Sequence, residues 1–359
     1  MDRRDFLKIV GTVVPAWSLV PVAHGQTSLY TGRVLINVHA EGGLDASSWT
    51  DPRETDPAMN NYAAARTPAG VAGDIRFAPM GNNASFFTRY NRQMLVLNGV
   101  NSETNSHEDG TRAHATGRLD MGYPNISELH AREYGYNLPL AWLAGSGGGF
   151  RTSAGLLPAT AVPDANTFRA LVSPNSASAT NDFMKQADLN KAFAFRAERM
   201  AERKANGQSL PRRALLSEQF VTADKGRALM DRIAGFIPAT FDRFTQAHVA
   251  LIAAQAGITS TVELASGGFD GHDQLANSYA NALPRLTDLV DYIWQKSDAL
   301  GMSSRVFVRI YSEFGRTPLN AGNGKDHWAV GSQVLMEANP PWGNRVLGAS
   351  GLASADEHA

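Results

Sequence analysis

Residues 33–45, RVLINVHAEGGLD, decide the fold class, because an apolar and partly β-branched run stops abruptly at an acid and two glycines. This pattern is typical of a buried strand that ends at a tight turn. Residues 94–100 (MLVLNGV) and 305–311 (RVFVRIY) repeat it, and residues 138–143 and 261–264 are two further strand candidates. Continuous apolar strands of this kind occur in parallel sheets that are buried on both faces.

Helical stretches separate these strands, with apolar residues recurring at spacings of three and four. The clearest of them are residues 181–205, 217–236, 241–256 and 274–300. The alternation of strands and helices predicts an α/β protein with a mostly parallel sheet and helices on both faces. In such a fold, functional sites gather beyond the carboxyl ends of the strands.

The first two dozen residues have the features of a removable twin-arginine export signal. Arg3 and Arg4 precede a mildly apolar stretch over residues 9–22, which is followed by small residues. A membrane anchor is the alternative, but spanning the hydrocarbon core takes about 20 apolar residues, and this stretch is shorter and contains a proline. We therefore expect residues 1–25 to be recognised by the twin-arginine translocation machinery. The protein would then work in the periplasm or outside the cell, without a stable membrane span.

The composition limits the chemistry that the remaining chain can perform. Residues 26–348 are long enough for one large domain, the organisation that we expect, or for two small ones, and residues 349–359 have no strand or helix pattern, as an irregular and truncated tail would. The net charge is −1 and 19% of residues are charged, so no overall field favours nucleic acid. The chain contains no cysteine, which excludes disulfides, thiolate metal sites and a cysteine nucleophile. Any catalytic or metal-binding group must therefore use oxygen or nitrogen.

Two polar clusters follow the first two predicted strands. Glu41 and Asp45 flank a glycine turn, where they are either candidate ligands or plain turn caps. After the second strand, a helix is predicted to start near Ser106, and its free amide groups together with Arg112 favour an anion such as phosphate or sulfate. The alternative at this point is ordinary helix capping by Ser106, with His107 on a polar surface.

Two more clusters follow the later strands. Asp270 and His272 are two residues apart, so an extended backbone would project both to the same side, as the ligands of one metal require. The alternative is that Asp273 only caps the next helix, and both interpretations can hold together. The segment 312–328 combines a carboxylate, an arginine and an Asp-His pair. A structural loop rarely needs all of these groups, so this segment favours a function.

In the order and content of these motifs the sequence resembles the exported DUF1501 family over roughly residues 33–348. The motifs that carry the resemblance are Gly43-Leu44-Asp45, Asn105-Ser106-His107 with Thr116-Gly117, residues 268–272, residues 312–317, and Asp326-His327-Trp328. That family is similar to the alkaline phosphatase and sulfatase superfamily, whose members hold one or two divalent metals at strand ends. The resemblance implies zinc, manganese, calcium or magnesium, with candidate ligands Glu41, Asp45, Asp270, His272, Glu313, Asp326 and His327.

The resulting hypothesis is an exported metal-dependent hydrolase of phosphate or sulfate esters. Ser106 or Thr104 is the candidate nucleophile, and His107 would transfer a proton or bind the metal. Arg112 or Arg316 would bind the anionic substrate. The rival hypothesis is an exported binding or assembly protein that keeps the fold but has lost efficient catalysis. It is supported by two departures from the superfamily pattern, His107 at the position of the usual nucleophile and Phe314 at the position of a histidine.

Overall fold

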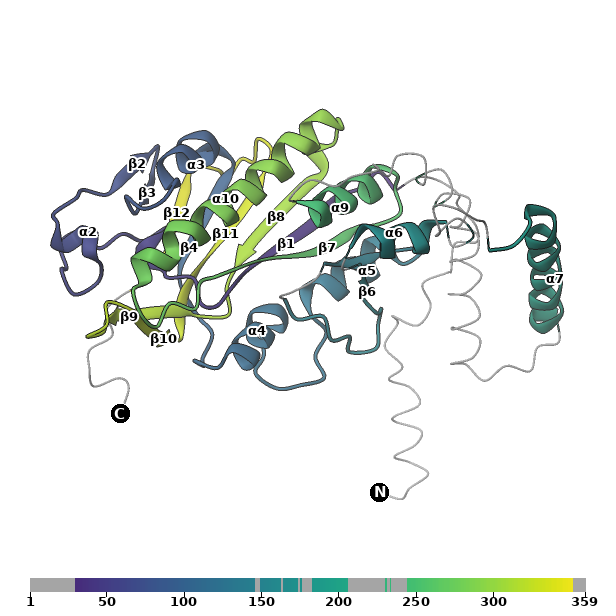
Figure 1. Ribbon diagram of the computed structural model, residues 1–359, viewed down its shortest axis with the longest axis horizontal. Coiled ribbons are helices and arrows are strands. Elements are labelled where there is room, and N and C mark those ends of the chain that lie inside the picture. The colour runs from purple at the N-terminus through teal and green to yellow at the C-terminus, as the bar shows by residue number, and fades with distance from the viewer. Residues whose placement is uncertain are drawn as a thin grey trace, which may run out of the picture.

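A computed structural model describes residues 30–145, 149–162, 164–173, 183–205 and 244–350, together with positions 175, 230 and 233. In this part of the chain an eight-stranded sheet has the order β12-β4-β11-β8-β1-β7-β5-β6 (Figure 1). Its strands are β1 (Val34–Glu41), β4 (Met94–Asn101), β5 (Trp142–Ala144), β6 (Thr160–Ala161), β7 (Thr261–Gly267), β8 (Val306–Tyr311), β11 (Val330–Glu337) and β12 (Arg345–Leu347).

The sheet is mostly parallel, which confirms the predicted class. β1 pairs in parallel with β7 and β8, and β5 pairs in parallel with β6 and β7. β11 is antiparallel to both of its neighbours, β4 and β8, so β4 runs in the same direction as β8. The carboxyl ends of β1, β4, β7 and β8 therefore lie at one edge of the sheet.

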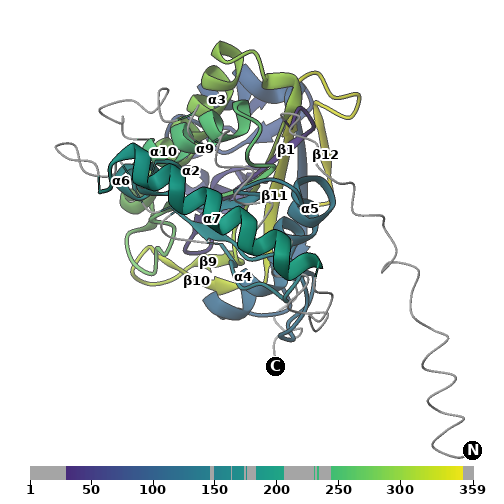
Figure 2. The same cartoon turned by 90° about the vertical axis from the view of Figure 1, so that its right-hand side faces the viewer.

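Helices cover both faces of the sheet. Figure 2 shows α3, α9 and α10 on one side of it and α5 on the other. The helices are α2 (Asn61–Ala64), α3 (Asn83–Tyr90), α4 (His107–Thr116), α5 (Ile126–Gly135), α6 (Ala165–Val172), α7 (Gln186–Ala205), α9 (Thr245–Gln255) and α10 (Leu275–Ala299). Three of the predicted helices correspond to α7, α9 and α10. The fourth, over residues 217–236, falls almost entirely outside the described residues.

A small hairpin builds the edge where the site lies. β9 (Gly315–Leu319) and β10 (Lys325–Trp328) pair antiparallel, with a register shift between Lys325 and His327. The Lys325 amide donates to the carbonyl oxygen of Gly271 at 2.9 Å, so the hairpin is fastened to the loop after β7. At Gly324 a Cβ atom would lie only 1.9 Å from the carbonyl oxygen of His272, so this close approach requires glycine. A second hairpin joins β2 (Gly70–Ala72) to β3 (Ile75–Phe77).

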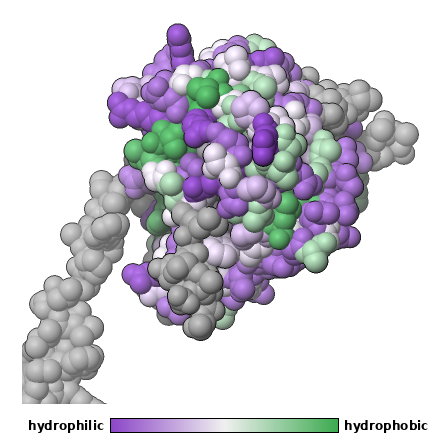
Figure 3. All heavy atoms as spheres, turned by 90° about the vertical axis from the view of Figure 1, so that its left-hand side faces the viewer, coloured by the Kyte–Doolittle hydropathy of each residue, from purple (hydrophilic) through white to green (hydrophobic). Residues whose placement is uncertain are grey.

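No helix among the described residues is long and apolar enough to cross a membrane. The end of the molecule in Figure 3 shows hydrophilic side chains interspersed with small groups of hydrophobic ones. The predicted signal over residues 1–25, and residues 351–359 of the predicted tail, lie outside the described residues.

The two faces of the sheet differ in chemistry. The face under α9 and α10 is apolar, with side chains such as Val38 and Ile310 in the main core. On the opposite face the central strands place three buried polar residues side by side, because Asn37 is paired with Glu263 on β7 and with Arg309 on β8. A polar layer therefore lies beneath α5.

Glu263 is the carboxyl group of this polar layer. Its Oε1 atom accepts hydrogen bonds from Asn37 Nδ2 at 3.1 Å and from the Ser127 hydroxyl, whereas Oε2 has no hydrogen-bond partner among the described residues. Burial raises the pKa of Glu263 to about 7, and this effect outweighs the lowering by the two hydrogen bonds. The side chain is 4% exposed, so water does little to relieve the cost of its charge.

We expect Glu263→Gln to stabilise the protein at pH 8 but not at pH 4. The folded-state pKa lies above the unfolded-state value, so the native state binds more protons and stability falls as pH rises from about 4.5 to about 7. The amide removes this loss, which is on the order of 2–3 kcal/mol. Urea unfolding at both pH values measures the effect, with the exposed Glu108→Gln as control. An equal change at both pH values would contradict the prediction.

Candidate metal centre

Three histidines and one aspartate meet beyond the carboxyl ends of the strands. His107 is the first residue of α4, which follows β4. Asp270 and His272 lie in the loop after β7, and His327 lies on β10. Figure 1 shows α4 and the β9–β10 hairpin at the same end of the sheet. We refer to His107, Asp270, His272 and His327 as the histidine cluster.

The atoms of the histidine cluster that can bind a metal are close together. One such atom from each of His107, Asp270 and His327 lies within 4.8 Å of the others. His272 Nε2 is 2.9 Å from His327 Nε2 and 3.0 Å from Asp270 Oδ1. Asp270 Oδ2 is 3.7 Å from His107 Nε2, and Asp270 Oδ1 is 3.5 Å from His327 Nε2. His107, Asp270 and His327 therefore form one group of potential metal ligands, and His272 lies next to Asp270 and His327.

Each ring of the histidine cluster has its other nitrogen, Nδ1, bonded to an oxygen. The contacts are His107 Nδ1 to Glu313 Oε1 at 2.8 Å, His272 Nδ1 to Asp326 Oδ1 at 3.0 Å, and His327 Nδ1 to the carbonyl oxygen of Asn105 at 2.8 Å. A carboxylate or carbonyl oxygen only accepts, so hydrogen bonding assigns the ring proton to Nδ1. In each neutral ring Nε2 then carries a lone pair that points toward the other members of the cluster.

This arrangement fits a divalent cation. The 2.9 Å contact between His272 Nε2 and His327 Nε2 is compatible with two states: His272 donates as an imidazolium, with a carboxylate oxygen 3.0 Å from each of its ring nitrogens, or both Nε2 atoms bind one electron-poor ion. Burial lowers the pKa of His327, which disfavours the alternative of an imidazolium donor there. Metal-binding histidines usually donate their second ring N–H to a carboxylate or a carbonyl. Nitrogen-rich donor sets suit zinc better than magnesium, calcium or manganese, which prefer oxygen ligands.

Arg316 holds Asp270 in place and is itself buried. Its guanidinium donates to Asp270 Oδ1 at 2.6 Å, to the carbonyl oxygen of Gly43 at 3.0 Å and to that of Lys325 at 2.9 Å. Burial alone would raise the pKa of the Asp270 carboxyl, but the contact with Arg316 outweighs it and lowers the pKa. Arg316 is therefore engaged inside the protein and does not face a substrate anion as the sequence had suggested.

Glu313 lies behind His107 and is almost fully buried. Its carboxylate accepts from the Gly42 amide at 2.8 Å and from His39 Nε2 at 2.9 Å, in addition to His107. Burial raises the pKa of Glu313, but the hydrogen bonds from the two histidines overcome this and hold the pKa far below its usual range. Glu313 therefore places a negative charge next to His107 and accepts the hydrogen bond from its Nδ1.

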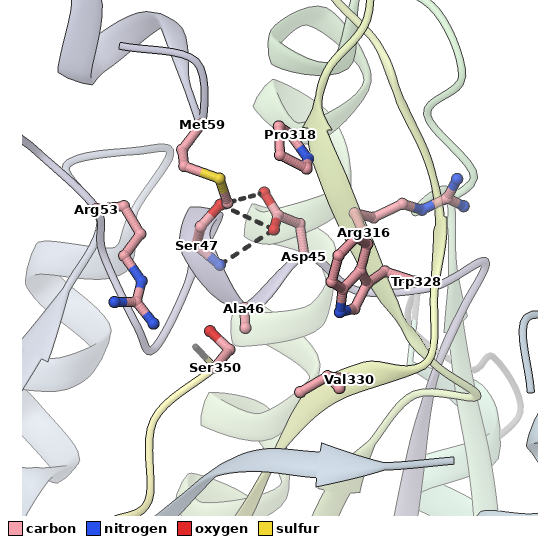
Figure 4. A pocket seen from close by; sticks show the side chains of 10 residues that line it. All are labelled: Asp45, Ala46, Ser47, Arg53, Met59, Arg316, Pro318, Trp328, Val330 and Ser350. Atoms are coloured by element: carbon pink, nitrogen blue, oxygen red, sulfur yellow. Dashed lines mark hydrogen bonds between the residues drawn. The ribbon is translucent and has the colours of Figure 1, made fainter. Parts of the chain in front are cut away.

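Asp45 lies apart from the histidine cluster, in a buried ion pair. Lys325 Nζ donates to Asp45 Oδ2 at 2.6 Å and to Ser47 Oγ at 2.7 Å. Figure 4 shows Asp45 and Ser47 pointing toward each other beside a small pocket of about 30 Å³. The structure therefore does not bring Asp45 to the same position as Asp270, whereas Glu41 does lie in the wall of the cleft described below.

The three candidates around the start of α4 make local contacts. The Ser106 hydroxyl caps α4 by accepting from the Asp109 amide at 3.5 Å, and Thr104 Oγ1 accepts from the Ser106 amide at 3.1 Å. Arg112 is buried, donates to the carbonyl oxygen of Leu119 at 2.7 Å and contacts Asp109. These contacts match the capping alternative. Both hydroxyls are acceptors in these contacts, and the Arg112 guanidinium is engaged with Leu119 and Asp109.

An open cleft of about 880 Å³ lies beside the histidine cluster, large enough for a small molecule. Asp270 and His107 form part of its wall. The other acidic and basic residues in its described lining are His39, Glu41, Glu108, Arg151 and Glu313. Sequence reasoning missed His39, Arg151 and Lys325. Four carboxylates and a single arginine thus face or border this cleft.

A mostly parallel sheet covered by helices, with histidines gathered beyond the carboxyl ends of its strands, defines an α/β protein with a candidate metal centre. The chain belongs to the family described as protein of unknown function (DUF1501), whose family model matches residues 33–337. None of the curated proteins matches the sequence.

Several solved structures are similar to this chain at low identity. A mutant alkaline phosphatase from the Antarctic bacterium TAB5 with Mg bound has a TM-score of 0.37 and 10% identity, covering 89% of this chain and 95% of that chain. The C-terminal periplasmic domain of EcEptC from Escherichia coli, in complex with Zn, has a TM-score of 0.37 and 12% identity, covering 87% and 74%. Ps i-CgsB in complex with k-i-k-neocarrahexaose has a TM-score of 0.39 and 9% identity, covering 88% and 68%. Similarity this weak says nothing about the chemistry of the site.

Proposed function

We propose that this protein is an exported metal-dependent hydrolase of phosphate or sulfate esters, with a divalent ion held by the histidine cluster. The observation that carries the proposal is the grouping of His107, Asp270 and His327, which each offer a metal-binding atom within 4.8 Å of the others, while the Nδ1 atoms of both histidines are bonded to oxygens. Export is proposed from the twin arginines near the N-terminus.

Different described residues would have different roles around such an ion. A divalent ion bound there would polarise an ester oxygen or lower the pKa of a water molecule. Arg316 keeps Asp270 ionised and oriented, and Glu313 orients His107 by accepting the hydrogen bond from its Nδ1. The exposed Arg151, whose Nη1 donates to the carbonyl oxygen of Gly145 at 3.0 Å, borders the cleft and is placed to contact an anionic group. Because Ser106 caps α4, we favour water over a hydroxyl side chain as the attacking group.

A second candidate is a protein that binds a metal and a ligand without efficient turnover. The observation that favours it is the charge of the cleft, whose described lining contains Glu41, Glu108, Asp270 and Glu313 but only one arginine. Arg112 and Arg316 donate to partners inside the protein. A doubly charged phosphate ester would then depend on the metal for most of its attraction.

Elemental analysis of the purified protein, followed by assays on aryl phosphates and aryl sulfates with added zinc or manganese, tests both candidates. We expect about one metal per chain, and hydrolysis that His327→Ala abolishes. His248→Ala, on α9, is the matched control and should retain both properties. Stoichiometric metal without turnover on either ester class would favour the binding protein. A wild-type protein that folds and takes up no metal would reject the metal centre.

A further inference from the structure

We infer that His39 is a positioning residue for the metal ligand His107, acting through the Glu313 carboxylate, and that it links this ligand to the wall of the cleft. The inference rests on the proposed metal site. It concerns a residue in the middle of the hydrogen-bonded chain from Gly149 through His39 and Glu313 to His107. The side chain of His39 is only 3% exposed, so a ligand in the cleft has little of it to contact.

Hydrogen bonding fixes the tautomer of His39. The Gly149 amide donates to His39 Nδ1 at 2.8 Å. A backbone N–H only donates, so Nδ1 is an acceptor and the ring proton is assigned to Nε2. His39 Nε2 therefore donates to Glu313 Oε2 at 2.9 Å. Stacking on Tyr311, with ring centroids 4.9 Å apart and planes inclined by 23°, holds the ring in the orientation that this donation needs.

Because His39 holds one oxygen of the Glu313 carboxylate, it also restricts the orientation of His107, which bonds to the other oxygen. The Oε1 atom of Glu313 accepts from the Gly42 amide and from His107 Nδ1, both at 2.8 Å. Its Oε2 atom accepts from His39 Nε2 at 2.9 Å and lies 3.0 Å from the Ser312 hydroxyl, which is also 2.6 Å from the carbonyl oxygen of Ala40. With both oxygens held, the carboxylate cannot rotate away from His107, whose proton stays on Nδ1. His107 Nε2 then keeps a lone pair directed at the histidine cluster. The Ser312 hydroxyl has a single proton, and its shorter contact directs that proton to Ala40, so removing the His39 donor at Oε2 would loosen the support of His107.

The other end of the chain is at the cleft. Gly149 and the following residues Phe150, Arg151 and Thr152 line it, so the backbone group that binds His39 belongs to the cleft wall. His39 thus connects the Gly149 backbone, in the cleft wall where a substrate would bind, to His107, which would bind the metal. If His39 were a buried histidine with only a packing role, it would make the same two hydrogen bonds, but its removal would leave His107 unchanged.

Two reciprocal substitutions separate positioning from packing. His39→Phe keeps an aromatic ring against Tyr311 but has no donor for Glu313. His39→Gln has an Nε2 donor at a similar reach but no ring. We expect His39→Phe to weaken zinc binding by about 10–100-fold, measured by competition with a chromophoric chelator, and His39→Gln to retain most of the affinity. His130→Gln, in a histidine that bonds Thr261 on the same face, is the control and should not change the affinity.

The second measurement is independent of metal. In ¹⁵N-histidine-labelled, metal-free protein, His107 should show a proton on Nδ1 in the wild type and in His39→Gln, and a mixture of tautomers in His39→Phe. A single Nδ1–H form of His107 in all three proteins would overturn the inference even if the wild type binds zinc. If the wild type binds no zinc, the proposed function fails, and the His107 tautomers still decide this inference. Should His39→Phe not fold, loss of the Nδ1–H form in His39→Gln would overturn it.

Discussion

Lys325→Met is expected to lower the free energy of unfolding by about 3–5 kcal/mol at neutral pH. Lys325 is fully buried, and its ammonium donates to Asp45 Oδ2 at 2.6 Å and to Ser47 Oγ at 2.7 Å. Burial lowers the pKa of this lysine, and Asp45 opposes that effect. Methionine fills a similar volume but leaves the Asp45 carboxylate buried without a cation, and a buried unpaired charge is costly.

Urea unfolding of single and double variants checks this expectation. Lys325→Met combined with Asp45→Asn removes both charges, so the double variant should be more stable than Lys325→Met alone. Lys191→Met, at an exposed position on α7, serves as the matched control and should change stability by less than about 0.5 kcal/mol. A loss below 1 kcal/mol in Lys325→Met, or a double variant no better than the single one, would show that the ion pair is not the important feature.

The strands that could be predicted are those whose runs are mostly apolar and contain only isolated polar residues, such as Asn37 and Arg309. β1, β4 and β8 are of this kind, and they were found close to their observed bounds. β11 was missed because Gly331, Ser332 and Gln333 interrupt its beginning. These residues are tolerated because the polar layer supplies partners, such as the contact between Arg309 Nε and Gln333 Oε1 at 3.0 Å. That partner is 24 residues away in the chain, so no local pattern reveals it.

In the candidate site, too, the residues that could be predicted are those marked by a local sequence pattern. Asp270, His272 and His327 could be predicted as neighbours because they follow strands that end at one edge of the sheet. The hydrogen bonds that hold Arg112 and Arg316 inside the protein could not be predicted, because their main acceptors are backbone carbonyl groups, which every sequence provides. His39 lies inside an apolar strand, where a single histidine draws no attention. Its alternation with Asn37 on one face of β1 is the signal that was available.

Zinc is expected to stabilise the wild-type protein by about 4 kcal/mol when the free metal is at 1,000 times its dissociation constant, and His327→Ala should lose most of this gain. The reason is that His327 Nε2 lies within 2.9 Å of His272 Nε2 and 3.5 Å of Asp270 Oδ1, so it is central to the donor set. Thermal unfolding with zinc and after chelation measures the difference. His248→Ala should behave as the wild type does.

The zinc effect should also depend on pH in a defined direction. A ligand imidazole must be deprotonated, so zinc affinity falls as pH drops through the range in which the histidines gain protons. Burial lowers the pKa of His327, which keeps this ring available to lower pH than an ordinary histidine. Zinc stabilisation should therefore be complete at pH 8 and lost on acidification, while Asp270 remains ionised throughout because Arg316 lowers the pKa of its carboxyl. Zinc stabilisation that is equal at pH 5 and pH 8, or that survives in His327→Ala, would mean that the metal binds at some other place than the histidine cluster.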